Sequence, residues 1–163
     1  MGTKGKAIVK LNVADLVTKL NKALADEWLA YYQYWVGAKV AKGPMRGAVV
    51  AELLEHAGEE LKHGEMLSDR IIQLGGTPIL NPGDWFKLTN CKYDAPTDPH
   101  VKRIVEQNIS AEQCAIDVYQ ALAELTMHDD PLTYHIALEF LTDEVEPEED
   151  LQALLEDMEF IGR

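Results

Sequence analysis

Hydrophobic side chains recur every three or four residues along most of this chain, which is typical of amphipathic helices. The first such stretch has apolar or aromatic side chains at Leu16, Leu20, Leu24, Tyr31, Tyr34 and Ala38. Asn12 or Asp15 precedes it as a helix cap, and the residues Lys-Gly-Pro-Met at 42–45 end it. We therefore predict a first long helix between this cap and residue 42.

The same periodicity predicts three further long helices. Their expected bounds are about 46–74, 99–127 and 131–160. Two glycines and a proline at 75–78 end the second helix, and Pro99 suits the first turn of the third. Pro131 opens the fourth helix after Asp129 or Asp130, either of which can cap it. Within the fourth helix, Pro147 is expected to interrupt the pattern.

Residues 75–98 are rich in turn formers, although 84–88 could form a short helix. Fully extended, this link spans up to about 80 Å, whereas a helix of 30 residues is about 45 Å long. The link can therefore return the third helix parallel to the second, while the short connections make their neighbours antiparallel. We predict an all-α fold, a four-helix bundle forming a single domain over 1–163, with 1–12 as an N-terminal tail and 75–98 as a crossover link.

Composition and charge limit the partners. The chain has 163 residues, enough for one sizeable core, and a formal net charge of -13. This charge argues against binding to nucleic acid or to an anionic membrane and favours cations. No run approaches the roughly 18 apolar residues of a membrane span, and no secretory signal is apparent, so we expect a cytoplasmic protein.

The stretch EHAGEELKHGEM, at 55–66, places candidate ligands on one helix face. At about 100° per residue, His56, Glu59 and His63 project within about 60° of one another, and Glu60 lies about 60° from His63. Glu60 and His63 form a Glu-x-x-His pair that can offer a carboxylate oxygen and an imidazole nitrogen to one ion. By itself this pattern is also found on solvated helix faces.

Two further glutamates make the metal interpretation stronger. Glu27 and Glu112 lie inside the apolar stripes of the first and third helices, and carboxylates are seldom buried unless they are paired or bound to metal. Tyr34 and Tyr119 each follow one of these glutamates by seven residues, so their phenols could hydrogen-bond the carboxylates. The alternative is that both are core tyrosines with solvated hydroxyls.

Five segments of the chain together resemble the Dps-like mini-ferritins of the thioferritin branch, within the ferritin superfamily. They are LNKALADEWLAYYQYW, EELKHGEMLSDRI, WFKLTNCKYDAP, SAEQCAIDVYQAL and EVEPEEDLQALLEDM. The resemblance implies a ferritin-like bundle in a dodecameric cage that oxidises ferrous iron with hydrogen peroxide, stores ferric mineral and protects against oxidative stress. It also implies a bacterioferritin-type site of two irons per subunit, with manganese or zinc as substitutes, held by Glu27, Glu60, His63, Glu112 and Glu144 with Tyr34 beside them.

The resemblance further implies that Cys91 and Cys114 form a redox-active disulfide beside the iron site. Residue spacing alone does not distinguish this from two reduced cysteines, because Cys114 points about 200° around the helix from Glu112. The path of the link that carries Cys91 is not predictable from its sequence.

The sequence departs from the family pattern at one ligand, since Pro147 occupies the position of a histidine. Four carboxylates still neutralise two ferrous ions, so the loss should weaken one iron position and impair the ferroxidase. Water could fill the gap, Glu148 could reach in, or the site could hold metal too poorly for rapid turnover. A kink at Pro147 could reposition these carboxylates, or the proline could be no adaptation at all.

Two other functions fit the same bundle. One is a di-iron or di-manganese peroxidase resembling rubrerythrins, without mineral storage, although the Cys-x-x-Cys pairs of rubredoxin-type domains are missing. The other is a non-catalytic cage or nucleoid protein, for which Lys4, Lys6 and Lys10 are a meagre basic tail. His100, His128 and His135 are not expected to be ligands.

Overall fold

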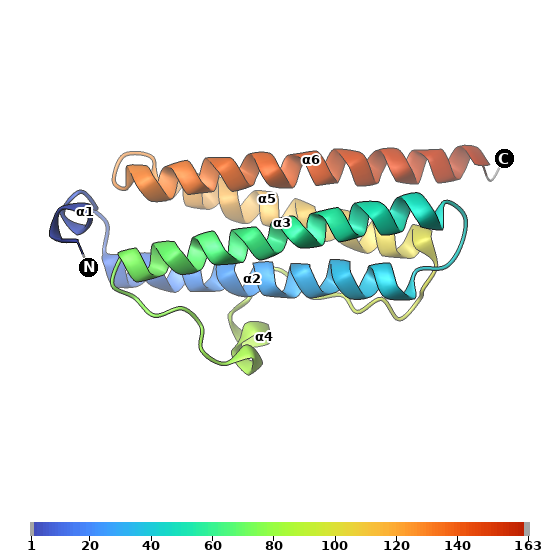
Figure 1. Cartoon of the computed structure of the whole chain (residues 1–163). Coiled ribbons are helices and arrows are strands. Elements are labelled where there is room, and N and C mark those ends of the chain that lie inside the picture. The colour runs from blue at the N-terminus through green and yellow to red at the C-terminus, as the bar shows by residue number, and fades with distance from the viewer. Residues whose placement is uncertain (1, 162–163) are drawn as a thin grey trace.

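The structure is a computed structural model that describes residues 2–161. Within these residues it contains six α-helices and a short 3-10 helix, η1. The long helices are α2 (Val13–Val40), α3 (Arg46–Gln73), α5 (Val101–Thr126) and α6 (Pro131–Ile161). The short ones are α1 (Thr3–Ala7), η1 (Pro82–Asp84) and α4 (Trp85–Leu88). Figure 1 shows the four long helices side by side as one elongated bundle, with α4 on the outside of α2.

The bundle has the predicted crossover topology. α2 packs along α3 and α5 packs along α6, each pair joined by a short connection and antiparallel. The segment after α3 returns along the outside of the bundle, so that α5 runs parallel to α3 (Figure 1). The prediction of an all-α four-helix bundle with a long crossover link is therefore confirmed. The expected N-terminal tail contains α1, and residues 1, 162 and 163 of the predicted domain lie outside the described residues.

The helix ends follow the predicted caps with one difference. Asn12 caps α2, because its side chain accepts hydrogen bonds from two backbone N–H groups of the first turn. α5 begins at Val101, two residues after Pro99, where its start was expected. The reason is that the Lys42 N–H donates to the Pro99 carbonyl at 2.7 Å and holds this segment extended, so that His100 becomes the cap.

The crossover link is fixed against α2 by aromatic and polar contacts. Trp85 stacks on Trp28 with ring centroids 5.5 Å apart and planes within 7° of parallel. Gln33 accepts a hydrogen bond from the Asp94 N–H at 2.9 Å and donates one to Asn108 at 3.2 Å. Buried Gln33 therefore ties the link to α5 as well as to α2.

The core consists of two apolar clusters at opposite ends of the bundle. One includes Leu16, Leu20, Leu24, Leu67, Ile71 and Phe140. The other includes Ala38, Leu53, Val101, Ile104, Leu151 and Met158. Each fully buried large side chain stabilises the fold by about 1.5–3 kcal/mol. Between the two clusters lies a layer of buried polar side chains, which contains the candidate functional site.

The interruption expected at Pro147 does not occur, since α6 continues through it as one helix. Proline lacks an N–H, so the carbonyl four residues earlier receives no hydrogen bond from it. Pro147 is buried, and α6 packs closely against α5. This packing holds the helix together across the missing bond.

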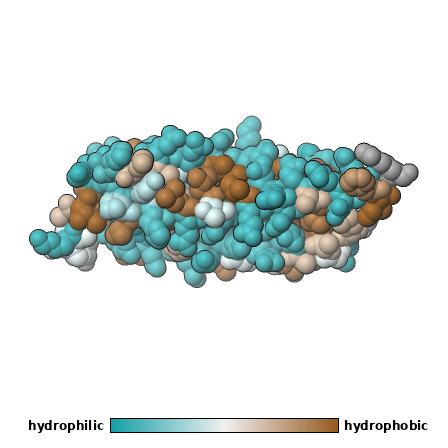
Figure 2. Space-filling view, turned by 90° about the horizontal axis from the view of Figure 1, so that it is seen from above, coloured by the Kyte–Doolittle hydropathy of each residue, from teal (hydrophilic) through white to brown (hydrophobic). Residues whose placement is uncertain are grey.

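The surface of the bundle is mainly polar. Figure 2 views the molecule from the side of α6 and shows hydrophobic residues scattered within a hydrophilic surface. Exposed apolar side chains on α6 include Leu132, Leu138 and Val145. Among the residues that the structure describes, no helix is both long enough and apolar enough to cross a membrane.

A buried ion pair joins α3 to the start of α6. Both Asp130 carboxylate oxygens accept hydrogen bonds from the Arg70 guanidinium at 2.8 Å. Asp130 also caps α6, accepting from the N–H groups of Leu132 and Thr133 at 3.2 Å. Burial by itself raises the pKa of Asp130. The hydrogen bonds from Arg70 and Thr133 lower it by more, so the net pKa lies below its usual value.

We predict that Asp130→Asn lowers the free energy of unfolding by about 3–5 kcal/mol at pH 7, because it leaves Arg70 buried without its charged partner. The pKa of Asp130 is lower in the folded chain than in the unfolded one, so this stabilisation is present above the unfolded value and is lost as pH falls through the folded value. Urea unfolding of both chains from pH 7 down to about pH 3 measures the difference. Asp129→Asn is the matched control, and equal losses for the two variants would contradict the prediction.

Candidate metal centre

Five predicted ligand residues meet at the middle of the bundle. α2 contributes Glu27, α3 contributes Glu60 and His63, α5 contributes Glu112 and α6 contributes Glu144. Each is at most 5% exposed. The periodicity of the four helices explains this, because each residue lies on the face that its helix turns toward the core.

His63 lies within reach of three of these carboxylates. Its Nδ1 is 3.3 Å from Glu27 Oε2, 3.4 Å from Glu144 Oε1 and 3.6 Å from Glu60 Oε2. One ligand atom from each of these four residues lies within 4.8 Å of all the others. On the other side of the ring, Nε2 is 3.2 Å from Asp143 Oδ2. Because a carboxylate only accepts, Nε2 must carry a hydrogen that it donates to Asp143. Nδ1 is the ring nitrogen that faces the three glutamates.

Two residues that support His63 were not found from the sequence. Asp143 holds its Nε2, and Phe140 packs on its ring with centroids 4.1 Å apart. An aspartate beside Glu144 in an acidic helix resembles any solvated carboxylate. Its spacing from His63 could be known only after α3 and α6 were placed together.

Two buried tyrosines, one on α2 and one on α5, each donate a hydrogen bond to a glutamate on the other of these two helices. The Tyr34 hydroxyl donates to Glu112 Oε1, and the Tyr119 hydroxyl donates to Glu27 Oε1. Each phenol thus reaches the glutamate of the opposite helix, α5 or α2. Burial raises the pKa of both phenols, and the neighbouring carboxylates raise it further. Both tyrosines therefore remain neutral hydrogen-bond donors at neutral pH.

The carboxylates are electrostatically unfavourable neighbours. Burial raises the pKa of Glu60, and the charges of Glu144 and Glu27 raise it further. Burial and Glu144 likewise raise the pKa of Glu112, and burial raises that of Glu144. Burial lowers the pKa of His63, but its contacts with the carboxylates raise it more, so the net direction is upward. Without cations, the cluster therefore retains protons that solvent-exposed glutamates would release.

Several buried atoms of the cluster have no hydrogen-bond partner among the described residues. They are Glu27 Oε2, His63 Nδ1, Glu112 Oε2 and Glu144 Oε1. Buried polar atoms in native proteins are seldom left in this state. Carboxylate oxygens with one imidazole nitrogen suit divalent iron or manganese, and four carboxylates balance two such ions. The residues present therefore fit two divalent metal ions.

α6 supplies no substitute for the histidine that the resemblance to the mini-ferritins would place at position 147. Pro147 offers no donor atom, and Glu148 accepts a hydrogen bond from Gln113 at 2.9 Å on the exposed side. Glu148 is thus not brought into the cluster with the other predicted ligands. Of the remaining histidines, His128 and His135 are exposed. His56 is buried one turn before Glu60.

A small cavity of about 30 Å³ reaches the cluster from beneath the crossover link. Its lining includes Glu27, Glu60 and Glu112 on one side and Thr89 and Cys91 on the other. A cavity of this size holds about one water-sized molecule.

Asp26 fixes the part of the link that covers this cavity. Its carboxylate accepts hydrogen bonds from the Thr89 hydroxyl, from the Asn90 N–H at 2.7 Å and from the Cys91 N–H at 2.9 Å. The Asn90 side-chain amide donates a further bond at 2.6 Å. Sequence reasoning missed Asp26, because nothing in the link indicates which residue of α2 it contacts. The signal available in the sequence was a second acid, directly before Glu27, within a largely apolar stretch.

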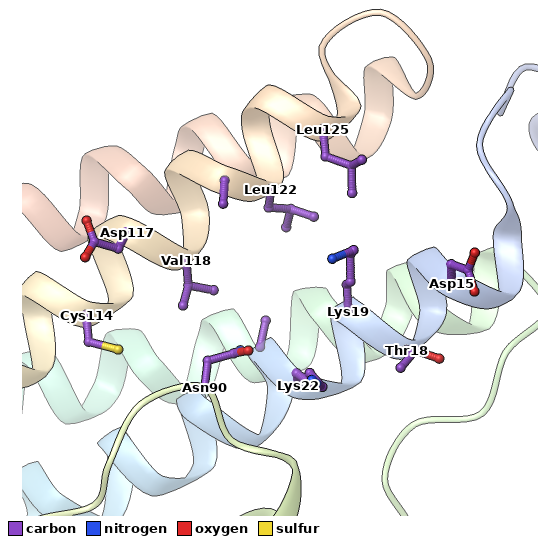
Figure 3. A pocket seen from close by; sticks show the side chains of 12 residues that line it. Asp15, Thr18, Lys19, Lys22, Asn90, Cys114, Asp117, Val118, Leu122 and Leu125 are labelled. Atoms are coloured by element: carbon purple, nitrogen blue, oxygen red, sulfur yellow. The ribbon is translucent and has the colours of Figure 1, made fainter.

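Cys91 and Cys114 are joined in a disulfide that links the crossover segment to α5, with Cα atoms 5.8 Å apart. Cys91 lines the small cavity, whereas Cys114 lines a second pocket of about 780 Å³ between α2 and α5. Figure 3 shows Cys114 at one end of this pocket and Leu125 toward the other, with Lys19 between the two helices. The disulfide thus lies between the outer pocket and the cavity at the carboxylates.

Comparison with known proteins gives consistent matches. The model of the ferritin-like domain family matches residues 17–161. The chain is 34% identical over 148 residues to the DNA protection during starvation protein of Pyrococcus furiosus, covering 89% of this chain and 79% of that protein. It is 46% identical to a dodecameric, bacterioferritin-related thioferritin of Bacteroides fragilis, with a TM-score of 0.96 over 99% of this chain and 97% of that one. Dps from Thermosynechococcus elongatus, at 18% identity, shares the fold with a TM-score of 0.83 over 94% and 95% of the two chains.

Proposed function

Because this chain belongs to the ferritin-like family, whose di-iron proteins bind and store iron, we propose that it oxidises ferrous iron at its metal centre and retains the ferric product. The observation that carries the proposal is the group of buried ligand atoms without partners at mid-bundle. Core positions such as these are normally occupied by apolar side chains. Four ionised carboxylates placed there are costly without compensation, whereas divalent cations would neutralise them.

The ligands divide between two ions. Glu27, Glu60, His63 and Glu144, whose ligand atoms lie within 4.8 Å of one another, would hold one ferrous ion. Glu60 and Glu144 would be shared with a second ion, to which Glu112 adds a carboxylate. Tyr34 and Tyr119 would hold the Oε1 atoms of Glu112 and Glu27 in place and leave the Oε2 atoms for metal. Asp143 would keep the His63 ring oriented, with its Nδ1 toward the ion.

Hydrogen peroxide is the oxidant that we propose. Two ferrous ions supply the two electrons that reduce one peroxide, so no hydroxyl radical is released: 2 Fe²⁺ + H₂O₂ + 2 H₂O gives 2 FeOOH + 4 H⁺. The cavity of about 30 Å³ beside Glu27, Glu60 and Glu112 is large enough for a molecule of this size. Carboxylates would suit both oxidation states of the iron, because they are hard donors.

We extend the proposal to the disulfide as a redox pair. Cys114 lines the outer pocket, so a thiol reductant could reach its sulfur from solvent. Cys91 belongs to the wall of the cavity that meets the carboxylates. Reduction would therefore change the contact between the link and α5 directly above the metal centre.

The proposal includes assembly into a dodecameric cage in the cytoplasm, with ferric mineral inside. Its support is the likeness to the dodecameric thioferritin of Bacteroides fragilis and the apolar side chains that a single chain leaves exposed. Ile72, Leu80, Phe86 and Ile161 are each more than half exposed. Contacts between copies would cover such side chains.

We predict that the metal-stripped protein, loaded anaerobically with about two ferrous ions per chain, oxidises them on addition of one equivalent of peroxide and retains the iron. Glu60→Gln should slow oxidation at least about 10-fold, because it removes a ligand of both ions. Stopped-flow absorbance measures the rate, and iron analysis after gel filtration measures retention. Exposed Glu55→Gln, on the same helix, should match the wild type.

Equal rates for the wild type and Glu60→Gln would contradict the proposed site. Rapid oxidation followed by complete loss of iron would instead favour a di-iron or di-manganese peroxidase without storage.

We further predict that Pro147→His tightens binding of the second ion about 10-fold, because it adds a neutral nitrogen donor at the position that lacks one. Anaerobic ferrous titration measures both affinities. Pro147→Ala is the matched control, since it also restores the helical N–H, worth about 3 kcal/mol of stability, but adds no ligand. An equal effect of both substitutions on iron affinity would show that position 147 acts only through the helix backbone.

A further inference from the structure

A second group of potential ligands lies one turn away from the metal centre. It consists of Glu52 and His56 on α3 and Asp150 on α6, with one ligand atom of each within 4.8 Å of the other two. None of them belongs to the set around His63. His56 lies four residues before Glu60, which is about 6 Å along the helix. Because α3 and α6 are antiparallel, Asp150 lies beyond Glu144 in the same direction along the bundle (Figure 1).

The His56 ring presents a free nitrogen to this group. The side chain is only 6% exposed, and Nε2 has no hydrogen-bond partner among the described residues. Glu52 Oε1 lies 3.8 Å from Nε2, too far for a hydrogen bond. On the opposite edge, Nδ1 is 3.0 Å from Glu59 Oε2. Since a carboxylate only accepts, Nδ1 carries a hydrogen, which leaves Nε2 as the nitrogen that can bind a metal ion.

His56 therefore repeats the arrangement of His63. In both rings one nitrogen is held by a carboxylate, Glu59 or Asp143, and the other is buried without a hydrogen bond and lies near further carboxylates. Metal-binding histidines are typically oriented in this way by an acceptor on the second nitrogen. Packing against the Tyr34 ring, at 5.5 Å between centroids, accounts for the burial of His56 but not for its unpaired Nε2.

We propose that Glu52, His56 and Asp150 form a third cation site for a first-row divalent metal ion, such as ferrous iron, manganese or zinc. One imidazole nitrogen and two carboxylates suit these ions and neutralise their charge. The site bridges α3 and α6 on the side of the metal centre where Pro147 provides no imidazole. It binds metal independently of iron oxidation, so it goes beyond the proposed ferroxidase.

Zinc tests this proposal, because it is redox-inert and binds the same donor types. The metal-stripped full chain should bind about three zinc ions, and His56→Gln should bind about one fewer. In crystals soaked with zinc, anomalous scattering should show a peak about 2.0–2.1 Å from His56 Nε2. This peak should persist in His63→Gln and disappear in His56→Gln. His135→Gln, an exposed histidine on α6, is the control and should retain every peak.

Two substitutions outside the imidazole keep the test decisive if His56→Gln fails to fold. Glu59→Gln should weaken zinc binding at this site about 10- to 100-fold through the orientation of the ring. Asp150→Asn should weaken it at least as much. An absent peak at His56 while zinc occupies the His63 cluster would overturn the proposal. Equal zinc content in the wild type and His56→Gln would also overturn it.

Discussion

The close approach of four buried carboxylates is the constraint on which the rest of this structure depends. Glu27, Glu60, Glu112 and Glu144 come from four different helices and meet between two apolar clusters. Taking such charges out of water is costly unless protons, partners or cations compensate them. The apolar clusters on either side hold the helices together, so the acidic layer cannot relax by turning its side chains outward. Under the proposed function, bound cations would supply this compensation.

The elements and most of the site follow from local patterns, whereas the supporting contacts do not. The periodicity of Leu16, Leu20 and Leu24 gives a helix, and an acid such as Glu27 inside that stripe must point into the core. Periodicity does not encode how two helices face each other. It therefore could not reveal that Tyr34 binds the glutamate of α5 or that Asp143 holds His63.

The crossover link presents the same difficulty more strongly, because it has no period at all. Its contacts with Asp26 and Gln33, and the position of Cys91 beside Cys114, follow from the path of the chain around α2. At Pro147 a local rule is clear but misleading, because proline inside a helix is expected to break it. The packing of α6 on α5 overrides that rule, and only the chemistry of the absent imidazole remains as a consequence.

Infrared difference spectroscopy on metal binding tests the central claim most directly, because protonated carboxyl groups and carboxylates absorb separately. Burial raises the pKa values of Glu60, Glu112 and Glu144, so the metal-free cluster holds protons to higher pH than exposed glutamates do. Zinc addition at pH 7 should therefore remove a protonated-carboxyl band and release protons to the buffer. An unchanged carboxyl band on saturation with zinc, with no proton release, would show that the buried acids do not depend on cations and would contradict the account.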